Sequence, residues 1–207
     1  MRRRLGHGML LLLLTILTMT MAAPVAPAQC ADTIMVRLRD VIPDLVTDVR
    51  YATTTNFTGR VLYPHDTLWA RGCMARALAE AQRIARAQGY QLKVFDAYRP
   101  LSVQHLMWSI LPDERYVADP AKGSRHNRGM AIDCTLLDAS GTEVDMGTPY
   151  DDFTERASAF YADLPDHVKA NRARLLDIMT QAGFDVLPTE WWHFDCRGWE
   201  QMSILNE

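Results

Sequence analysis

The chain has 207 residues, of which 48% are hydrophobic and 23% are charged, and its formal net charge is −3. This length predicts one domain with at most a short appendage, and the composition excludes disordered, collagen-like and coiled-coil proteins. Lys and Arg form no run beyond the first few residues. Because the net charge is also negative, we expect no nucleic-acid partner.

The N-terminal segment has the three parts of a secretory signal peptide: a basic start, the apolar stretch Met9–Leu17 and a small-residue exit. The apolar stretch is shorter than the roughly 20 residues that a spanning helix needs, which disfavours the alternative of a retained membrane anchor. We expect cleavage after Ala23 or Ala28. The chain is then a signal peptide over 1–28 and one domain over 29–207, periplasmic or secreted, with no stable membrane insertion.

The expected elements follow in chain order. Residues 34–62 combine β-branched residues with a polar turn, which favours short strands and loops. A helix is expected from a cap at Thr67 to Gly89, because apolar residues recur there at helical spacing. Next come a strand over 92–96, a helix over 102–110, a loop over 112–124, a strand over 130–136, a turn-rich segment over 138–152, a helix over 165–182 and a strand over 191–196. Because no regular βαβ rhythm appears, we predict a small α+β domain with a largely antiparallel central sheet flanked by helices.

The first candidate site lies around Asp133, a lone carboxylate in an otherwise apolar strand segment. Strand parity places Asp133 on the face opposite Ile132 and Cys134, which belong to the core. A carboxylate there is costly unless a cation pairs with it. That cation could be a zinc ion shared with His126 from the preceding loop, or an arginine in an ordinary ion pair.

The second candidate site is Glu190-Trp191-Trp192-His193. Pro188 and the two tryptophans disfavour a helix, so we expect Glu190 on a turn and His193 on a strand, both facing one cleft. Together with the first cluster this gives a His, Asp, His donor set that leaves a fourth zinc position open, as in catalytic zinc sites. A nearby glutamate can take a proton from water activated by such an ion.

These motifs resemble those of a known family. Ser124-x-His126-x-x-Gly129-x-Ala131-x-Asp133 and Glu190-x-x-His193 look like the signature of the zinc D-alanyl-D-alanine peptidases. Further segments resemble the VanX-type D-Ala-D-Ala dipeptidases within that family: Tyr51-Ala52-Thr53, Asn56-Phe57-Thr58-Gly59, Asp96-Ala97-Tyr98-Arg99-Pro100 and Met146-Gly147. The likeness covers about residues 35–200. It departs at the signal peptide and in the region after Tyr63.

The resemblance implies the family's α+β (hedgehog-like) fold and one zinc ion per chain on His126, Asp133 and His193. It also implies Glu190 as the general base and Arg99 as the cation that stabilises the tetrahedral intermediate. Arg99 ends a strand and precedes a proline, so its guanidinium is held in place to donate to an oxyanion. The alternative role of Arg99 is a structural pair with Asp96. Tyr51, Ser124 and Asp96 are candidate substrate contacts.

The predicted function is a secreted zinc dipeptidase that hydrolyses D-Ala-D-Ala to free D-Ala in cell-wall peptide turnover. One alternative is a D,D- or L,D-carboxypeptidase acting on peptidoglycan stem peptides. Another is a non-catalytic cell-wall-binding module, which Glu190 disfavours because a binder needs no base. A dipeptidase must pair a substrate ammonium with a carboxylate, and the segment 138–152 offers Asp138, Glu143, Asp145, Asp151 and Asp152.

The four cysteines are Cys30, Cys73, Cys134 and Cys196, which allow three full disulfide connectivities. Strand parity places Cys134 and Cys196 away from the zinc face, where they could meet if their strands are neighbours. Alternatively, Cys73 of the first long helix could pack over the same face and compete. In an oxidising compartment we therefore expect at least one disulfide that involves Cys134 or Cys196.

Overall fold

The computed structural model describes residues 34–205. The predicted signal peptide over 1–28 lies outside this range. Within the described range, no helix has the length and apolar character needed to cross a membrane.

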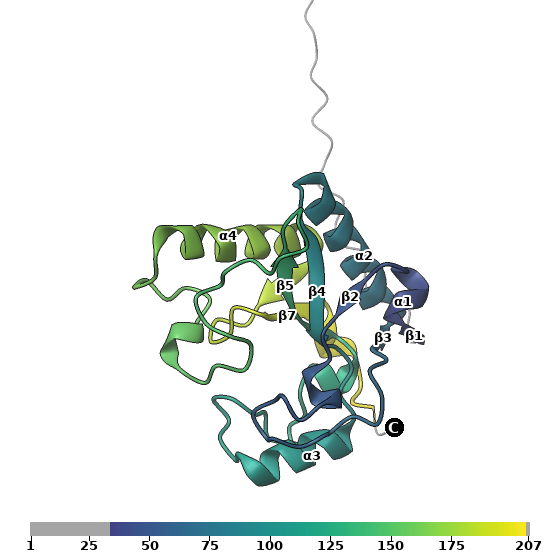
Figure 1. Cartoon of the computed structure of the whole chain (residues 1–207). Helices are drawn as coiled ribbons and strands as arrows, with labels where there is room; N and C mark the ends of the chain where they lie inside the picture. Colours follow the sequence, from purple (N-terminus) through teal and green to yellow (C-terminus); the bar gives the residue numbers. More distant parts are fainter. Residues whose placement is uncertain (1–33, 206–207) are drawn as a thin grey trace, which may run out of the picture.

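A five-stranded sheet forms the centre of the molecule (Figure 1). Its strands, in spatial order, are β2 (Val46–Thr47), β4 (Gln91–Asp96), β5 (Ala131–Leu137), β7 (His193–Cys196) and β6 (Phe184–Val186). Only the β2–β4 pair is parallel, and the other three pairs are antiparallel. The expected α+β fold with a largely antiparallel sheet is therefore confirmed.

Within the described residues, four α-helices accompany this sheet: α1 (Leu38–Val41), α2 (Gly72–Ala87), α3 (Leu101–Ile110) and α4 (Asp166–Gln181). The helices α2 and α4 contact each other and pack on β4 and β6, respectively. Buried side chains of these helices, such as Leu78 and Leu175, join one core with Val94, Cys134 and Phe194 of the sheet. The helix α3 lies at the other end of the molecule from α4 (Figure 1).

The structure corrects one expected helix. Helix α2 begins at Gly72, whereas the prediction started it from a cap at Thr67. Residues Trp69–Arg71 form strand β3, which pairs with β1 (Met35–Arg37) in a separate two-stranded sheet. Strand β6 was also missed. Both short strands form by pairing with other strands. The periodicity of a segment by itself does not reveal such pairing.

The predicted disulfide of Cys134 or Cys196 is wrong, because both cysteines are free and buried. The strands β5 and β7 are neighbours, but Cys134 lies beside Trp192 and Cys196 beside Met130. The two cysteines are thus offset by four positions along β5, or roughly 13 Å. A disulfide needs Cα atoms within about 7 Å. Cys73 is disulfide-bonded, and its partner lies outside the described residues.

Candidate active site

Two adjacent strands and one turn bring the three predicted metal ligands together. Asp133 of β5 lies directly opposite His193 of β7 in the antiparallel register. His126 begins a short 3-10 turn that ends at Gly129, whose φ is +65°. A Cβ on Gly129 would also lie 3.3 Å from the backbone nitrogen of Arg71, so glycine suits this turn on both counts.

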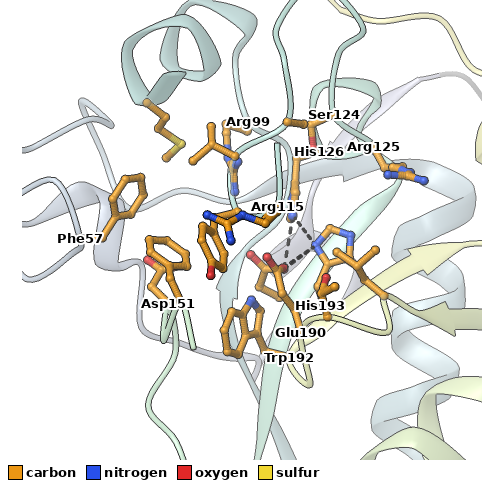
Figure 2. Close-up of a pocket in the computed structure, with 18 of the residues that line it drawn as sticks. Phe57, Arg99, Arg115, Ser124, Arg125, His126, Asp151, Glu190, Trp192 and His193 are labelled. Atoms are coloured by element: carbon orange, nitrogen blue, oxygen red, sulfur yellow. Dashed lines mark hydrogen bonds and ion pairs between the residues drawn. The ribbon is translucent and has the colours of Figure 1, made fainter. Parts of the chain in front are cut away.

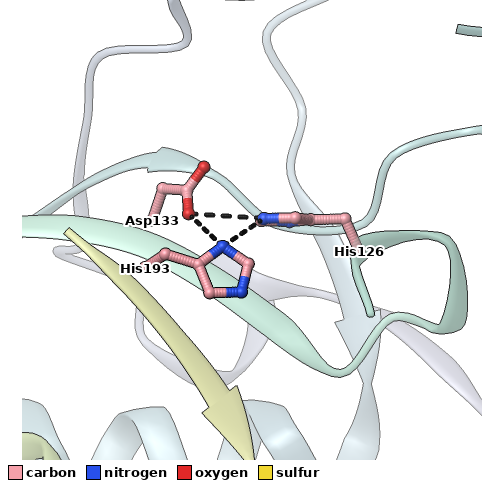
Figure 3. A group of neighbouring side chains, drawn as sticks. All are labelled: His126, Asp133 and His193. Atoms are coloured by element: carbon pink, nitrogen blue, oxygen red, sulfur yellow. Dashed lines mark hydrogen bonds and ion pairs between the residues drawn. The ribbon is translucent and has the colours of Figure 1, made fainter. Parts of the chain in front are cut away.

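The three donor atoms form a nearly equilateral triangle (Figure 3). Nε2 of His126 lies 3.1 Å from Nδ1 of His193 and 3.3 Å from Oδ1 of Asp133, and the third side is 3.1 Å. Ligands bound at 2.0–2.1 Å around a tetrahedral zinc are about 3.3 Å apart. The triangle therefore matches one face of such a tetrahedron.

Hydrogen bonds behind the histidines fix which nitrogen faces the centre. Nδ1 of His126 donates to the Ala97 carbonyl at 2.6 Å, and Nε2 of His193 donates to Oδ1 of Asp195 at 2.9 Å. Each ring therefore presents an unprotonated nitrogen to the other and to Asp133. Such partners behind a metal-binding histidine are the usual means of setting its tautomer and orientation.

The surroundings of Asp133 also indicate a cation site. Its Oδ2 accepts a hydrogen bond from the Tyr150 hydroxyl at 2.9 Å, but its Oδ1 is buried and has no hydrogen-bond donor. Two nitrogen lone pairs and a carboxylate oxygen that face one point repel one another unless a cation lies between them. This donor set fits a zinc ion.

Glu190 lies on the turn that leads into β7, next to the metal ligands (Figure 2). Its Oε2 is 3.8 Å from Nδ1 of His193, and its side chain is 14% exposed. Burial raises the pKa of Glu190 to about 7, and Asp133 adds to this effect while His193 and Arg99 oppose it. A carboxyl in this range can both accept and return a proton near neutral pH. The placement agrees with the predicted turn.

Arg99 lines the same cavity and is held rigidly. Its Nε and Nη2 donate to Oδ2 of Asp96 at 3.0 and 2.8 Å, and its Nη1 donates to Gln104 at 3.1 Å. The guanidinium also lies 5.3 Å from the ring centroid of Tyr51. The structural pair with Asp96 is therefore present, and it holds a guanidinium that borders the cavity, where the predicted catalytic role would require it.

Asp96 lies behind Arg99 and does not line the cavity. It is fully buried, and its second oxygen accepts hydrogen bonds from the Tyr63 hydroxyl and the Ala97 backbone. Direct contact with substrate does not fit this placement. The structure instead gives Asp96 the geometry of a positioning residue for Arg99.

Tyr51 and Ser124, the other candidate substrate contacts, both line the cavity, whose volume is about 290 Å³. The Ser124 hydroxyl accepts a hydrogen bond from the His126 backbone, and the Tyr51 hydroxyl donates to Asp151 at 3.1 Å. Asp151 lines the cavity as well, and its φ of +61° is the one positive φ of a non-glycine residue between residues 34 and 205.

Several functional neighbours were not singled out from the sequence. Asp195 and Tyr150 orient metal ligands, and Gln104 holds Arg99. Asp195 had a usable signal, because it is two residues from His193 on the same strand and so shares its face. Tyr150 and Gln104 reach the site from a loop and a helix, and nothing in their local sequence indicates these contacts.

Comparisons with known proteins agree with this geometry. Residues 31–202 match the model of the peptidase M15 family described as D-Ala-D-Ala dipeptidase. The D-alanyl-D-alanine dipeptidase of Escherichia coli K12 is 40% identical over 161 residues, which is 78% of this chain and 83% of that protein. The chain belongs to the D-Ala-D-Ala dipeptidase family. It is a zinc metallopeptidase, and His126, Asp133 and His193 form its zinc site.

Two further members of the dipeptidase family come from enterococci. The D-alanyl-D-alanine dipeptidase of Enterococcus faecium is 31% identical over 182 residues, covering 77% of this chain and 90% of that protein. The D-alanyl-D-alanine dipeptidase of Enterococcus faecalis V583 is 34% identical over 169 residues, covering 71% of this chain and 83% of that protein. These relatives place almost the whole described domain within the family.

Solved structures are more distant. A mutant of the vancomycin-resistance D,D-pentapeptidase VanY in complex with Zn(II) has a TM-score of 0.44 at 17% identity, and covers 67% of this chain and 78% of that chain. The LD-carboxypeptidase LdcB has a TM-score of 0.42 at 21% identity, and covers 64% of this chain and 61% of that chain.

Proposed function

We propose that this protein is a secreted zinc dipeptidase that hydrolyses free D-Ala-D-Ala to D-Ala in the turnover of cell-wall peptides. The observation that carries the choice of a free dipeptide is Asp151, a carboxylate on the cavity wall. Family membership supplies the D-Ala-D-Ala class of substrate. The features of the cavity support a free dipeptide as the substrate rather than a longer peptide.

Asp151 is suited to receive an ammonium group. Burial and the nearby Asp133 raise the pKa of Asp151 well above its usual range, while Arg99 and the Tyr51 hydroxyl lower it only in part. A substrate ammonium would supply the missing positive charge and favour the ionised carboxylate. The unusual φ of Asp151 aims this side chain at some cost in backbone strain, which is typical of functional sites.

The other cavity residues support the hydrolytic chemistry. Zinc at its site supplies Lewis-acid polarisation of the scissile carbonyl and activation of water. Glu190, three residues before a zinc ligand, takes the proton from water and returns it to the leaving amine. The guanidinium of Arg99, oriented by Asp96 and Gln104, donates hydrogen bonds to the oxyanion of the tetrahedral intermediate.

The experiment compares D-Ala-D-Ala with N-acetyl-D-Ala-D-Ala, which lacks the ammonium. We expect acetylation to lower kcat/KM at least tenfold, which is about 1.4 kcal/mol. Asp151→Asn should reduce this discrimination by lowering activity mainly on the free dipeptide. Asp152→Asn is the matched control, because Asp152 caps its own turn through Thr154 and lies outside the cavity. A stem pentapeptide cleaved as fast as the free dipeptide would establish a carboxypeptidase instead.

Secretion has support of its own. The signal-type N-terminus is one part of it, and the disulfide at Cys73 is another, since disulfides persist in oxidising compartments. Mass spectrometry of the protein purified from its native host tests this part. We expect a mature chain that starts at Pro24 or Gln29. An intact chain that begins at Met1 and stays in the cytoplasm would contradict secretion.

A further inference from the structure

Three aromatic side chains meet on the wall of the active-site cavity, and each comes from a different loop. The ring centroid of Phe153 lies 5.1 Å from that of Phe57 and 4.9 Å from that of Tyr116. Phe57 follows the turn at Tyr51, Tyr116 lies between α3 and the metal-binding turn, and Phe153 follows β5. We call Phe57, Tyr116 and Phe153 the aromatic wall.

The aromatic wall adjoins Asp151. Phe153 is two residues from Asp151 in the chain. The Tyr51 ring, whose hydroxyl donates to Asp151, packs edge-on against Phe57 at 6.3 Å. Figure 2 shows Phe57 and Asp151 on the side of the cavity away from the metal-binding histidines. A substrate that lies between the metal ligands and Asp151 therefore directs its amino end toward the aromatic wall.

The three rings lie outside the fully buried core, although Phe57 and Tyr116 pack against it. All three are half-buried, whereas Phe95, Phe184 and Phe194 are at most 1% exposed and fill the interior. Removal of one ring from the aromatic wall should thus leave the domain folded while it opens space next to the substrate.

We propose that the aromatic wall limits the substrate to two residues, because it occupies the space that a further residue on the amino side would need. The proposal rests on the proposed function, since it requires the amino end of the dipeptide to face Asp151. A peptide with one more residue carries an amide and another side chain at this point. It can bind only if it displaces the rings and the loops that bear them.

The test measures kcat/KM for D-Ala-D-Ala and for the tripeptide L-Lys-D-Ala-D-Ala, with Phe153→Ala and Phe57→Ala as the variants. Phe160→Ala is the matched control, because Phe160 is 62% exposed and lies outside this cavity. Zinc content and melting temperature are recorded for each protein. We expect the ratio of tripeptide to dipeptide kcat/KM to rise at least tenfold in both aromatic-wall variants, and to stay within twofold of wild type in the control.

A ratio within twofold of wild type in both aromatic-wall variants would overturn the proposal. An equal loss on both substrates would also overturn it, because the rings would then only hold the loops in place. Phe57→Leu decides the question if the alanine variants lose zinc or fail to fold. If the wild-type enzyme itself cleaves the tripeptide as fast as the dipeptide, the proposed function fails instead, so the two failures are distinguishable.

Discussion

Replacing Asp195 with alanine should weaken zinc binding although Asp195 does not touch the metal site. Its Oδ1 accepts the Nε2 proton of His193 at 2.9 Å, and this hydrogen bond leaves Nδ1 as the lone pair that faces the metal. Without it the ring can rotate or change tautomer. Loss of such a partner typically lowers metal affinity 10- to 100-fold. The expected cost is therefore about 1.4–2.7 kcal/mol.

The structure supplies a conservative variant and a matched control. Asp195→Asn keeps an acceptor oxygen but loses the charge, so its effect should be smaller than that of Asp195→Ala. Asp185 lies directly opposite Asp195 in the β6–β7 register, yet its carboxylate is exposed and pairs with Arg197. Asp185→Ala thus removes the same group from the same face of the sheet without touching His193.

Competition with a fluorescent zinc chelator measures the Kd of each protein for zinc. Turnover at saturating zinc then measures any effect of the substitution on catalysis apart from metal affinity. We expect Asp195→Ala to bind zinc most weakly and Asp195→Asn to bind it less weakly. The Kd of Asp185→Ala for zinc should stay within twofold of wild type. If Asp195→Ala bound zinc as tightly as wild type, the hydrogen bond would not control the donor geometry of His193, and the reasoning would be refuted.

Three further predictions concern the mechanism and the cysteines. Glu190→Gln should retain zinc but lower kcat roughly 10²- to 10⁴-fold. Because the base must be ionised, kcat of the wild-type enzyme should fall as the pH drops through the pKa of Glu190. If kcat of Glu190→Gln falls in the same way at low pH, that decline belongs to another group. Arg99→Ala should also retain zinc and lose roughly 3 kcal/mol of transition-state stabilisation. Arg99→Lys should not restore turnover, because a lysine cannot make the paired contacts to a carboxylate. A near-normal kcat in either variant would contradict the role of Arg99 in stabilising the oxyanion. Burial raises the pKa of the Cys134 thiol and raises that of Cys196 to about 12, so neither should react with a thiol reagent until the oxidised protein is denatured, as mass spectrometry of labelled peptides would show.

The metal site could be predicted from the sequence because its signals are local. Asp133 is conspicuous in an apolar strand, and parity alone separates it from the core residues Ile132 and Cys134. The motif of Glu190 and His193 lies on one turn and the strand that follows it, so both side chains reach the same cavity without help from distant segments. The long elements were predictable for the same reason, since their periodicity is contained within the element.

Features set by pairing between distant segments could not be predicted. Strand β3 forms because Trp69 pairs with Arg37, and a helical pattern in the following residues hid it. The register that separates Cys134 from Cys196 by four positions is likewise a property of two strands together. Asp96 was predicted both as a candidate substrate contact and as a possible partner of Arg99, and only the packed structure shows that it pairs with Arg99 and does not line the cavity.

The position of the zinc ligands in the sheet also links metal binding to completion of the fold. His126 and His193 are 67 residues apart, and β7 is the last strand between residues 34 and 205. A shift of β7 by one residue would turn His193 to the opposite face. A partly made or partly folded chain without this strand therefore has only two of the three ligands. Tight zinc binding therefore requires that β7 has paired with β5 in the correct register, so metal binding and completion of the sheet stabilise each other.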